Sequence, residues 1–353
     1  MRAKPPAEDA LTRVGTGLGA ELHEAPAAVA GQAQTLAAPI AELAGRLLRK
    51  PPRVVVTCAR GSSAHAAAFA KHLIERHVGI PVAAAAPNIA TIYRRPLRLD
   101  GELFLAISQS GRSDDLIEAS TAARCAGALT AAIVNDTESP LARACDIVLP
   151  MTAGLELSVA ATKTFVASLA ALLRLIAHWS ANEAMRAACE RLPGRIEAAA
   201  QLDWSEALHP LAAARSLAAI GRGPTLAIAR EAALKLKEVC GLHAEAFSSA
   251  EFRHGPIALV APAYPVLMLA PGDESALGFA DLAADLRRKG AHVLVAEPGR
   301  RAAGRLAVLA PDQAEADAIC LIQTFYGFLL RLAAQRGADA ERPRHLQKVT
   351  RTR

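Results

Sequence analysis

Short apolar runs, several rich in β-branched residues, alternate along this chain with longer alanine-rich stretches. The runs fall at 54–61, 103–111, 127–134 and 146–150 in the first half, and at 216–223, 266–272, 290–296 and 306–311 in the second. Such runs are typical of buried strands, and the stretches between them are typical of helices. Strands that alternate with helices predict an α/β fold built on parallel sheets covered on both faces.

The four runs of the first half match the four of the second at a nearly constant offset of about 160 residues. The match indicates a duplication, although four ordinary βα units could also converge on such a spacing. We therefore predict two tandem doubly wound domains, at 41–180 and 202–334. The remaining segments are an N-terminal arm or packing helix at 1–40, with an acidic helical piece at 21–34, a linking helix at 181–201 and a C-terminal tail at 335–353.

Composition excludes several classes of protein. Apolar residues make up 52% of the chain, which favours a large core over disorder. The net charge of +6 comes without a basic helix carrying interleaved aromatic residues, so we expect an anionic small-molecule substrate and no nucleic acid. The six cysteines show no C-x-x-C spacing, which predicts buried reduced thiols and neither a zinc site nor a redox pair. With no signal peptide and no apolar segment long enough to span a membrane, we expect a cytoplasmic protein.

A serine cluster at 107–113 follows one apolar run and precedes a predicted helix that begins near Asp114. Such a strand-to-helix turn presents backbone N–H groups and the positive end of the helix dipole, which together suit a phosphate. The alternative is a polar turn that binds nothing. Gly61-Ser62-Ser63 forms a second turn of this kind, whereas the matching turns of the second half lack the serines and one carries two acids. We infer that the first half binds the anion and the second supplies another function.

The second half carries candidate acid–base groups. Lys235 and Glu238 are three residues apart on a predicted helix and share one face. Glu231 and Lys235, four apart, could instead form a surface ion pair on a solvated helix face. Further on, the Gly-Pro step after His254 would end any helix and hold this histidine in a loop, where it could transfer a proton or be an ordinary exposed histidine.

Several ordered motifs together resemble the double sugar-isomerase (SIS) module of glucosamine-6-phosphate synthases and of isomerising glucosamine-6-phosphate deaminases. The motifs are the serine cluster, Glu156 to Phe165, Ala233 to Glu238, His243 to Glu245, Glu251 to Pro256 and Leu346 to Thr350. The resemblance covers about residues 40–353. It implies two flavodoxin-like, three-layer αβα domains, no cofactor and no metal.

The resemblance also implies roles for individual residues. Phosphate contacts fall on Ser63, Ser108, Gln109, Ser110 and Ser113, and sugar contacts fall on Val159 and Ala161. Four further residues match the family's catalytic groups: Glu238 as the base that moves a proton between C1 and C2, Lys235 as its charge partner, His254 as the ring-opening residue and Lys348 as the lysine that closes over the sugar. In this family the histidine reaches across to the neighbouring subunit, so a homodimer is implied.

The sequence departs from the synthase pattern in ways that resemble the deaminases. Only about forty residues precede the first predicted domain, position 2 is Arg2, and we expect no glutaminase domain and no ammonia made from glutamine. Ala161 replaces a serine of the synthases, and Arg112-Ser113 replaces an acid-Thr pair. We therefore expect a deaminase that converts glucosamine 6-phosphate to fructose 6-phosphate and ammonia. The alternatives are a SIS-type aminotransferase or isomerase on another amino-sugar phosphate, such as a galactosamine or fructosamine phosphate, and a non-catalytic sugar-phosphate sensor.

Overall fold

The computed structural model describes residues 17–300 and 302–348, which form two compact units, each built around one parallel sheet. We call them the N-sheet unit (residues 25–156, 163–193 and 347–348) and the C-sheet unit (residues 17–24, 157–162 and 194–346). Two long helices near the unit boundaries are α1 (Leu18–Thr35) and α8 (Glu183–Ala199). The predicted acidic helix at 21–34 and linking helix at 181–201 correspond to these elements.

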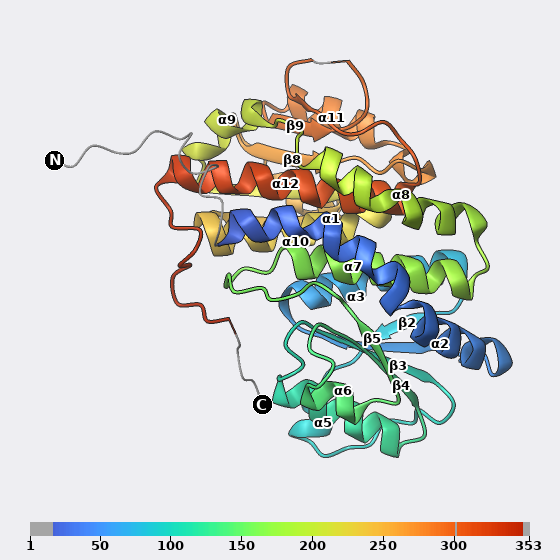
Figure 1. The fold of residues 1–353 in the computed structure, drawn as a ribbon. Helices are drawn as coiled ribbons and strands as arrows, with labels where there is room; N and C mark the ends of the chain where they lie inside the picture. The colour runs from blue at the N-terminus through green and yellow to red at the C-terminus, as the bar shows by residue number, and fades with distance from the viewer. Residues whose placement is uncertain (1–16, 301, 349–353) are drawn as a thin grey trace. The chain divides into compact units, whose positions relative to one another are not determined.

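The N-sheet unit contains five parallel strands in the order β2-β1-β3-β4-β5. The strands are β1 (Val55–Ala59), β2 (Val82–Ala84), β3 (Leu103–Ser108), β4 (Leu129–Val134) and β5 (Ile147–Pro150). The helices are α2 (Ala37–Arg49), α3 (Gly61–His77), α4 (Asn88–Thr91), α5 (Asp114–Cys125), α6 (Pro140–Ala144) and α7 (Lys163–Trp179). α3 and α2 pack with α7, whereas α4 and α6 pack with α5 on the other side of the sheet (Figure 1).

The C-sheet unit repeats this arrangement in the order β10-β9-β8-β6-β7. Its strands are β6 (Ser216–Gly221), β7 (His243–Ser248), β8 (Pro265–Leu269), β9 (His292–Ala296) and β10 (Arg305–Leu306). Its α-helices are α9 (Leu208–Ala212), α10 (Pro224–Cys240), α11 (Phe279–Arg288) and α12 (Ala314–Arg336). Short 3-10 helices are η2 (Ser205–Ala207), η3 (Glu251–His254), η4 (Pro256–Leu259) and η5 (Glu274–Ala276). α10 packs against α12 and also contacts β6 and β7.

Three expectations need correction. The last predicted strand, 306–311, is only the two-residue β10 at 305–306. The loop expected around His254 is instead a pair of 3-10 helices, because Gly255 at φ 139° separates η3 from η4. Cys125 is exposed, whereas the other five cysteines are buried, and burial raises the pKa of Cys58 to about 12.

One helix of the described residues, α12, is long and apolar enough to cross a membrane. The most apolar window of α12 is 78% buried, as is typical of a core helix. This corrects the expectation that no apolar segment is long enough to span a membrane. Of the predicted tail, residues 342–348 contain neither helix nor strand, and 349–353 lie outside the described residues.

Candidate active site

The predicted phosphate loops lie at the topological switch point of the N-sheet unit. β1 and β3 are neighbours in the sheet, with Ala59 opposite Ile107, and the chain leaves them in opposite directions to β2 and β4. Open parallel sheets bind their ligands beyond the strand ends at such a point. Ser63 stands in the first turn of α3, directly after β1, and the serine cluster directly follows β3. The topology therefore brings both predicted phosphate loops to one edge of the sheet.

The serine loop is shaped by its own polar groups. The hydroxyl of buried Ser108 accepts a hydrogen bond from the Gly111 N–H at 3.1 Å, and the Ser110 hydroxyl accepts one from the Arg112 N–H at 3.3 Å. Gly111 has φ 61°, and a Cβ at this position would lie 2.1 Å from the Ser139 Oγ, so only glycine fits. Gln109, Ser110 and Ser113 are half-buried, with side chains that a ligand can reach.

Ion pairs fix the rim of this loop. Arg60, which precedes α3, donates from Nε and Nη2 to the buried Asp115 Oδ2 at 2.9 and 2.8 Å. Asp115 stands in the first turn of α5, so this pair ties the starts of both helices together. Arg112 pairs with Asp136 at 2.9 Å. The loops therefore offer an anion serine hydroxyls and the N–H groups of the helix starts, beside two arginines that are each held by a carboxylate.

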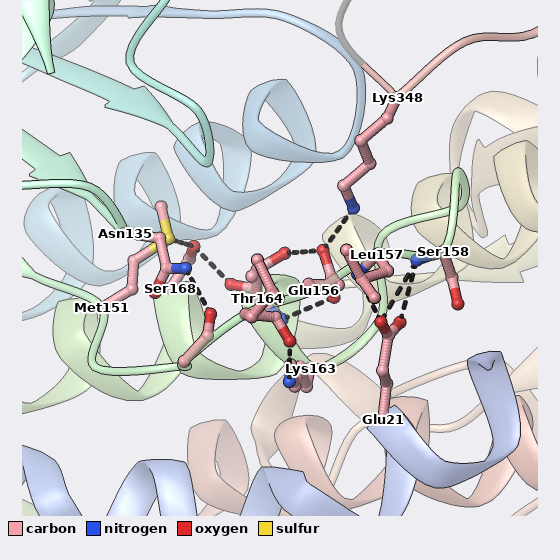
Figure 2. A network of polar contacts seen from close by, with 12 residues as sticks. Glu21, Asn135, Met151, Glu156, Leu157, Ser158, Lys163, Thr164, Ser168 and Lys348 are labelled. Atoms are coloured by element: carbon pink, nitrogen blue, oxygen red, sulfur yellow. Dashed lines mark hydrogen bonds and ion pairs between the residues drawn. The ribbon is translucent and has the colours of Figure 1, made fainter. Parts of the chain in front are cut away.

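Lys348 contacts a buried carboxylate in the N-sheet unit (Figure 2). The Glu156 side chain is 0% exposed, and its Oε2 accepts a hydrogen bond from Lys348 Nζ at 2.9 Å. The same carboxylate accepts from the Thr164 N–H at 3.1 Å and from the Thr164 hydroxyl at 2.7 Å, at the start of α7. Nearby, the buried Lys163 donates to the Leu155 carbonyl at 2.6 Å. Glu156 therefore connects the tail lysine to a core helix.

The segment that carries Val159 and Ala161 is held in the C-sheet unit by a different acid. The carboxylate of Glu21 on α1 accepts hydrogen bonds from the backbone N–H groups of Leu157 and Ser158 (Figure 2). The Ser158 hydroxyl also donates to Glu341 at 3.4 Å. Val159 and Ala161 follow this anchored stretch, and both are half-buried. Glu21 therefore fixes the backbone that leads to both predicted sugar contacts.

The predicted acid–base pair is present on α10, and it is buried. Lys235 Nζ lies 2.5 Å from Glu238 Oε2 and 3.4 Å from Glu231 Oε1, with Lys235 1% exposed, Glu231 0% and Glu238 21%. The Tyr326 hydroxyl of α12 donates to Glu231 at 3.4 Å. The alternative of a solvated surface pair is therefore wrong, because α12 covers this face of α10. Glu238 alone of the three keeps appreciable contact with solvent.

Charge on Lys235 is maintained despite its burial. Burial alone would lower the pKa of Lys235, but the nearby carboxylates of Glu231 and Glu238 outweigh this effect and hold the pKa above its ordinary value. Lys235 is therefore cationic at neutral pH. A fixed positive charge beside Glu238 suits a reaction in which negative charge develops on a sugar oxygen.

His254 is exposed at the last position of η3 in the C-sheet unit. Within the described residues, no hydrogen bond or ion pair joins it to Lys235 or Glu238. The structure thus brings together Lys235 with Glu238 and Ser63 with the serine cluster, but it does not bring His254 into contact with the α10 pair. Sequence reasoning missed Glu21 as a side-chain anchor and Glu156 as the contact of Lys348, although Glu156 opens a motif that the resemblance had singled out.

Comparisons with known proteins identify the family. The SIS domain model matches residues 47–178 and 210–296. A glutamine–fructose-6-phosphate aminotransferase of Zymomonas mobilis is 32% identical over 93% of this chain and 57% of its own length, so the chain spans little more than half of that relative.

Among the described residues, no group of three or more His, Cys, Asp or Glu side chains has an arrangement that could hold a metal ion.

Solved structures agree with this match. A protein of Silicibacter pomeroyi DSS-3, provisionally named a phosphosugar isomerase, is 41% identical with a TM-score of 0.86, over 91% of this chain and 98% of that one. The C-terminal domain of glucosamine-fructose-6-phosphate aminotransferase from Francisella tularensis is 25% identical with a TM-score of 0.79, over 94% of this chain and all of that domain. Sequence, strand order and these likenesses agree: the chain belongs to the SIS domain family.

Proposed function

We propose that this protein is an isomerising sugar-phosphate enzyme that converts glucosamine 6-phosphate to fructose 6-phosphate and ammonia. The observation that carries the proposal is the Lys235–Glu238 pair, a buried ammonium 2.5 Å from a carboxylate that is partly open to solvent. A sensor needs no such group, whereas proton transfer between neighbouring sugar carbons needs a carboxylate held in a fixed position. The serine cluster supports a phosphorylated substrate, because it gathers hydroxyls at a helix start.

The proposed chemistry assigns one step to each group. His254 opens the sugar ring by moving a proton between the ring oxygen and the C1 hydroxyl. Glu238 then removes the C2 proton and returns it to C1, and Lys235 stabilises the negative charge that develops on O1. As C1 is protonated, nitrogen loses a proton and O1 gains one, so the product is an imine at C2 with a hydroxyl at C1. Water adds to C2, the C–N bond breaks, and ammonia leaves as the ketone of fructose 6-phosphate forms.

A second candidate is the isomerase half of an aminotransferase, which would use ammonia delivered to it. The 32% identity to the Zymomonas mobilis aminotransferase favours this alternative. Ala161 and the Arg112-Ser113 pair favour the deaminase, since both differ from the synthase pattern. The two candidates share the proton transfer at Glu238 and differ only in how nitrogen enters or leaves C2.

The test is to incubate purified protein with glucosamine 6-phosphate and to measure ammonia and fructose 6-phosphate over time. We expect equal amounts of both products, and none from a Glu238→Gln control. A parallel reaction in D2O, with fructose 6-phosphate alone, reports deuterium exchange at C1 by NMR. Exchange without ammonia release would support the aminotransferase candidate. Neither exchange nor ammonia, with binding intact, would leave only the sensor.

A further inference from the structure

The tail segment that carries Lys348, residues 342–348, makes few side-chain hydrogen bonds or ion pairs with the rest of the described protein. Residues 342–348 form neither helix nor strand, and most of their side chains are exposed. Among these described tail residues, Lys348 alone makes a side-chain hydrogen bond or ion pair, and one of its contacts is to Glu156 at 2.9 Å. Few contacts mean a small free-energy difference between docked and undocked tail. The Glu156–Lys348 ion pair is therefore placed to decide how much of the protein has its tail docked.

Glu156 is a rigid docking point. Its carboxylate is completely buried and is already oriented by the N–H and hydroxyl of Thr164, at the first turn of α7. α7 is itself almost wholly buried, so the carboxylate cannot follow the tail when the tail moves. A buried carboxylate is costly without a cation or strong donors, and the Lys348 ammonium supplies charge from the exposed side. The pair therefore joins a fixed acid to a movable base.

We propose that Glu156 is the positioning residue that docks the C-terminal tail and presents Lys348 to the sugar. An ammonium has three N–H donors, so the bond to Glu156 leaves others for sugar oxygens. The inference rests on the proposed function for the part that Lys348 plays in turnover. The docking contact itself stands on the geometry of Glu156 and Lys348.

Replacement of Glu156 by Gln separates tail docking from the support of α7. The amide oxygen can still accept from the Thr164 N–H, and the amide N–H can donate to the Thr164 hydroxyl. The amide nitrogen then faces the Lys348 ammonium, donor against donor, so the tail contact is lost while the α7 contact is kept. Lys348→Met removes the same contact from the exposed side and leaves the hydrogen bonds between Glu156 and Thr164 in place. Glu42→Gln, on an exposed ion pair of α2, is the matched control.

Trypsin cleavage measures docking without substrate. Arg344 is exposed, and Arg342 precedes Pro343 and so resists trypsin, which makes the Arg344–His345 bond a reporter within the tail. Loss of a charge-assisted hydrogen bond at a partly exposed lysine should speed cleavage about three- to tenfold, as followed by mass spectrometry. We expect this in Glu156→Gln, in Lys348→Met and, with no further increase, in the double variant. The Glu42→Gln protein should be cleaved at the wild-type rate.

Kinetics then test the presentation of Lys348. Glu156→Gln should lower kcat about tenfold and change KM for the sugar phosphate less than about threefold, because the serine loop is untouched. A wild-type cleavage rate in Glu156→Gln, or additive effects in the double variant, would overturn the docking proposal. A higher kcat would overturn it too, since Glu156 would then withhold Lys348. If the wild type shows no turnover, the proposed function fails, while the cleavage rates still decide the docking contact.

Discussion

Buried carboxylates in this protein hold backbone N–H groups in place. Glu21 binds two N–H groups of the segment that leads to Val159, Glu156 binds the start of α7, and Glu102 binds the N–H groups of Arg53 and Val54 before β1 at 2.8 and 3.0 Å. A carboxylate is a stronger acceptor than a carbonyl, so each fixes backbone N–H groups that have no partner within a helix or sheet. At the residue scale, these acids carry out the positioning that regular secondary structure performs elsewhere.

Glu102 should make stability depend on pH. Burial raises the pKa of Glu102, but hydrogen bonds from the Val54 N–H and from Arg53 outweigh it and hold the pKa below its ordinary value of 4.5. Because the pKa of Glu102 is lower in the folded state, the ionised carboxylate stabilises the folded protein above about pH 4.5. This stabilisation is lost as the pH falls through the lowered pKa. The Glu102→Gln variant should therefore have a lower free energy of unfolding than the wild type at pH 7, and the difference between the two should become smaller toward pH 3. Urea unfolding at several pH values measures this, and a gap that does not change with pH would contradict it.

Glu238→Gln should bind sugar phosphate and fail to turn it over. The amide keeps the shape and can still accept from Lys235, but it has no basicity for the C2 proton. We expect kcat to fall at least about a thousandfold with the dissociation constant for fructose 6-phosphate nearly unchanged. Calorimetric titration beside the ammonia assay provides both numbers. Near wild-type turnover would place the base on another residue.

At the scale of elements, the C-terminal end of α12 is hydrogen-bonded to several other chain segments. Arg336, in its last turn, donates to the carbonyl of Cys240 at the end of α10, to those of Leu211 and Ala212 at the end of α9, and to that of Ala214 just after α9. The last carbonyls of a helix have no partner within the helix, so this guanidinium acts as a shared cap. One side chain thereby joins the C-terminal ends of α9, α10 and α12 in the C-sheet unit.

Arg336→Lys should destabilise this unit by about 2 kcal/mol. An ammonium cannot reach all four carbonyls, and each hydrogen bond to a charged group contributes about 1.5–3 kcal/mol net of exchange with water. The matched control is Arg331→Lys on the same helix, whose partner Asp203 is exposed. That change should cost less than about 0.5 kcal/mol. Thermal unfolding of both variants makes the comparison, and equal losses would refute the capping role.

The eight apolar runs predicted most strands of both sheets, because parallel strands buried on both faces have nearly continuous apolar sequences. The runs did not predict the edge strands β2 and β7, because β2 has only three residues and β7 includes the exposed His243 and Glu245. β10 was predicted too long because its apolar run, 306–311, leaves the sheet after Leu306. Edge strands form because they pair with a neighbouring strand, and a local sequence pattern does not show that pairing.

The site was predictable in its residue types and less so in its contacts. The strand-to-helix position of the serine cluster follows from its flanking runs, and the α10 pair follows from helical spacing. Burial of Lys235 does not, since it depends on α12, some ninety residues further along the chain. The contacts of Glu21 with Leu157 and of Glu156 with Lys348 likewise join residues more than a hundred positions apart. Long-range hydrogen bonds have no periodic signal in a sequence.

At the scale of the whole molecule, exposure of His254 on η3 agrees with a site completed by a second subunit, and we predict that the active unit is at least a dimer. Inactive Glu238→Gln and inactive His254→Ala chains should regain activity when mixed under conditions that allow exchange. About half the dimers are then mixed, each with one intact site, so roughly a quarter of wild-type activity should return. Verified exchange without recovery would show that each site is built within one chain.

The C-sheet unit is assembled from three separate stretches of chain, and the earliest of them leaves the ribosome long before the last. Leu18 and Leu22 are buried in the folded C-sheet unit. During synthesis they lack most of their packing partners until the N-sheet unit has been made. Nascent chains of this protein therefore carry an exposed apolar segment until its packing partners are made, which is the kind of surface that chaperones bind. Cutting the gene between the two repeats would separate this segment from the unit that buries it.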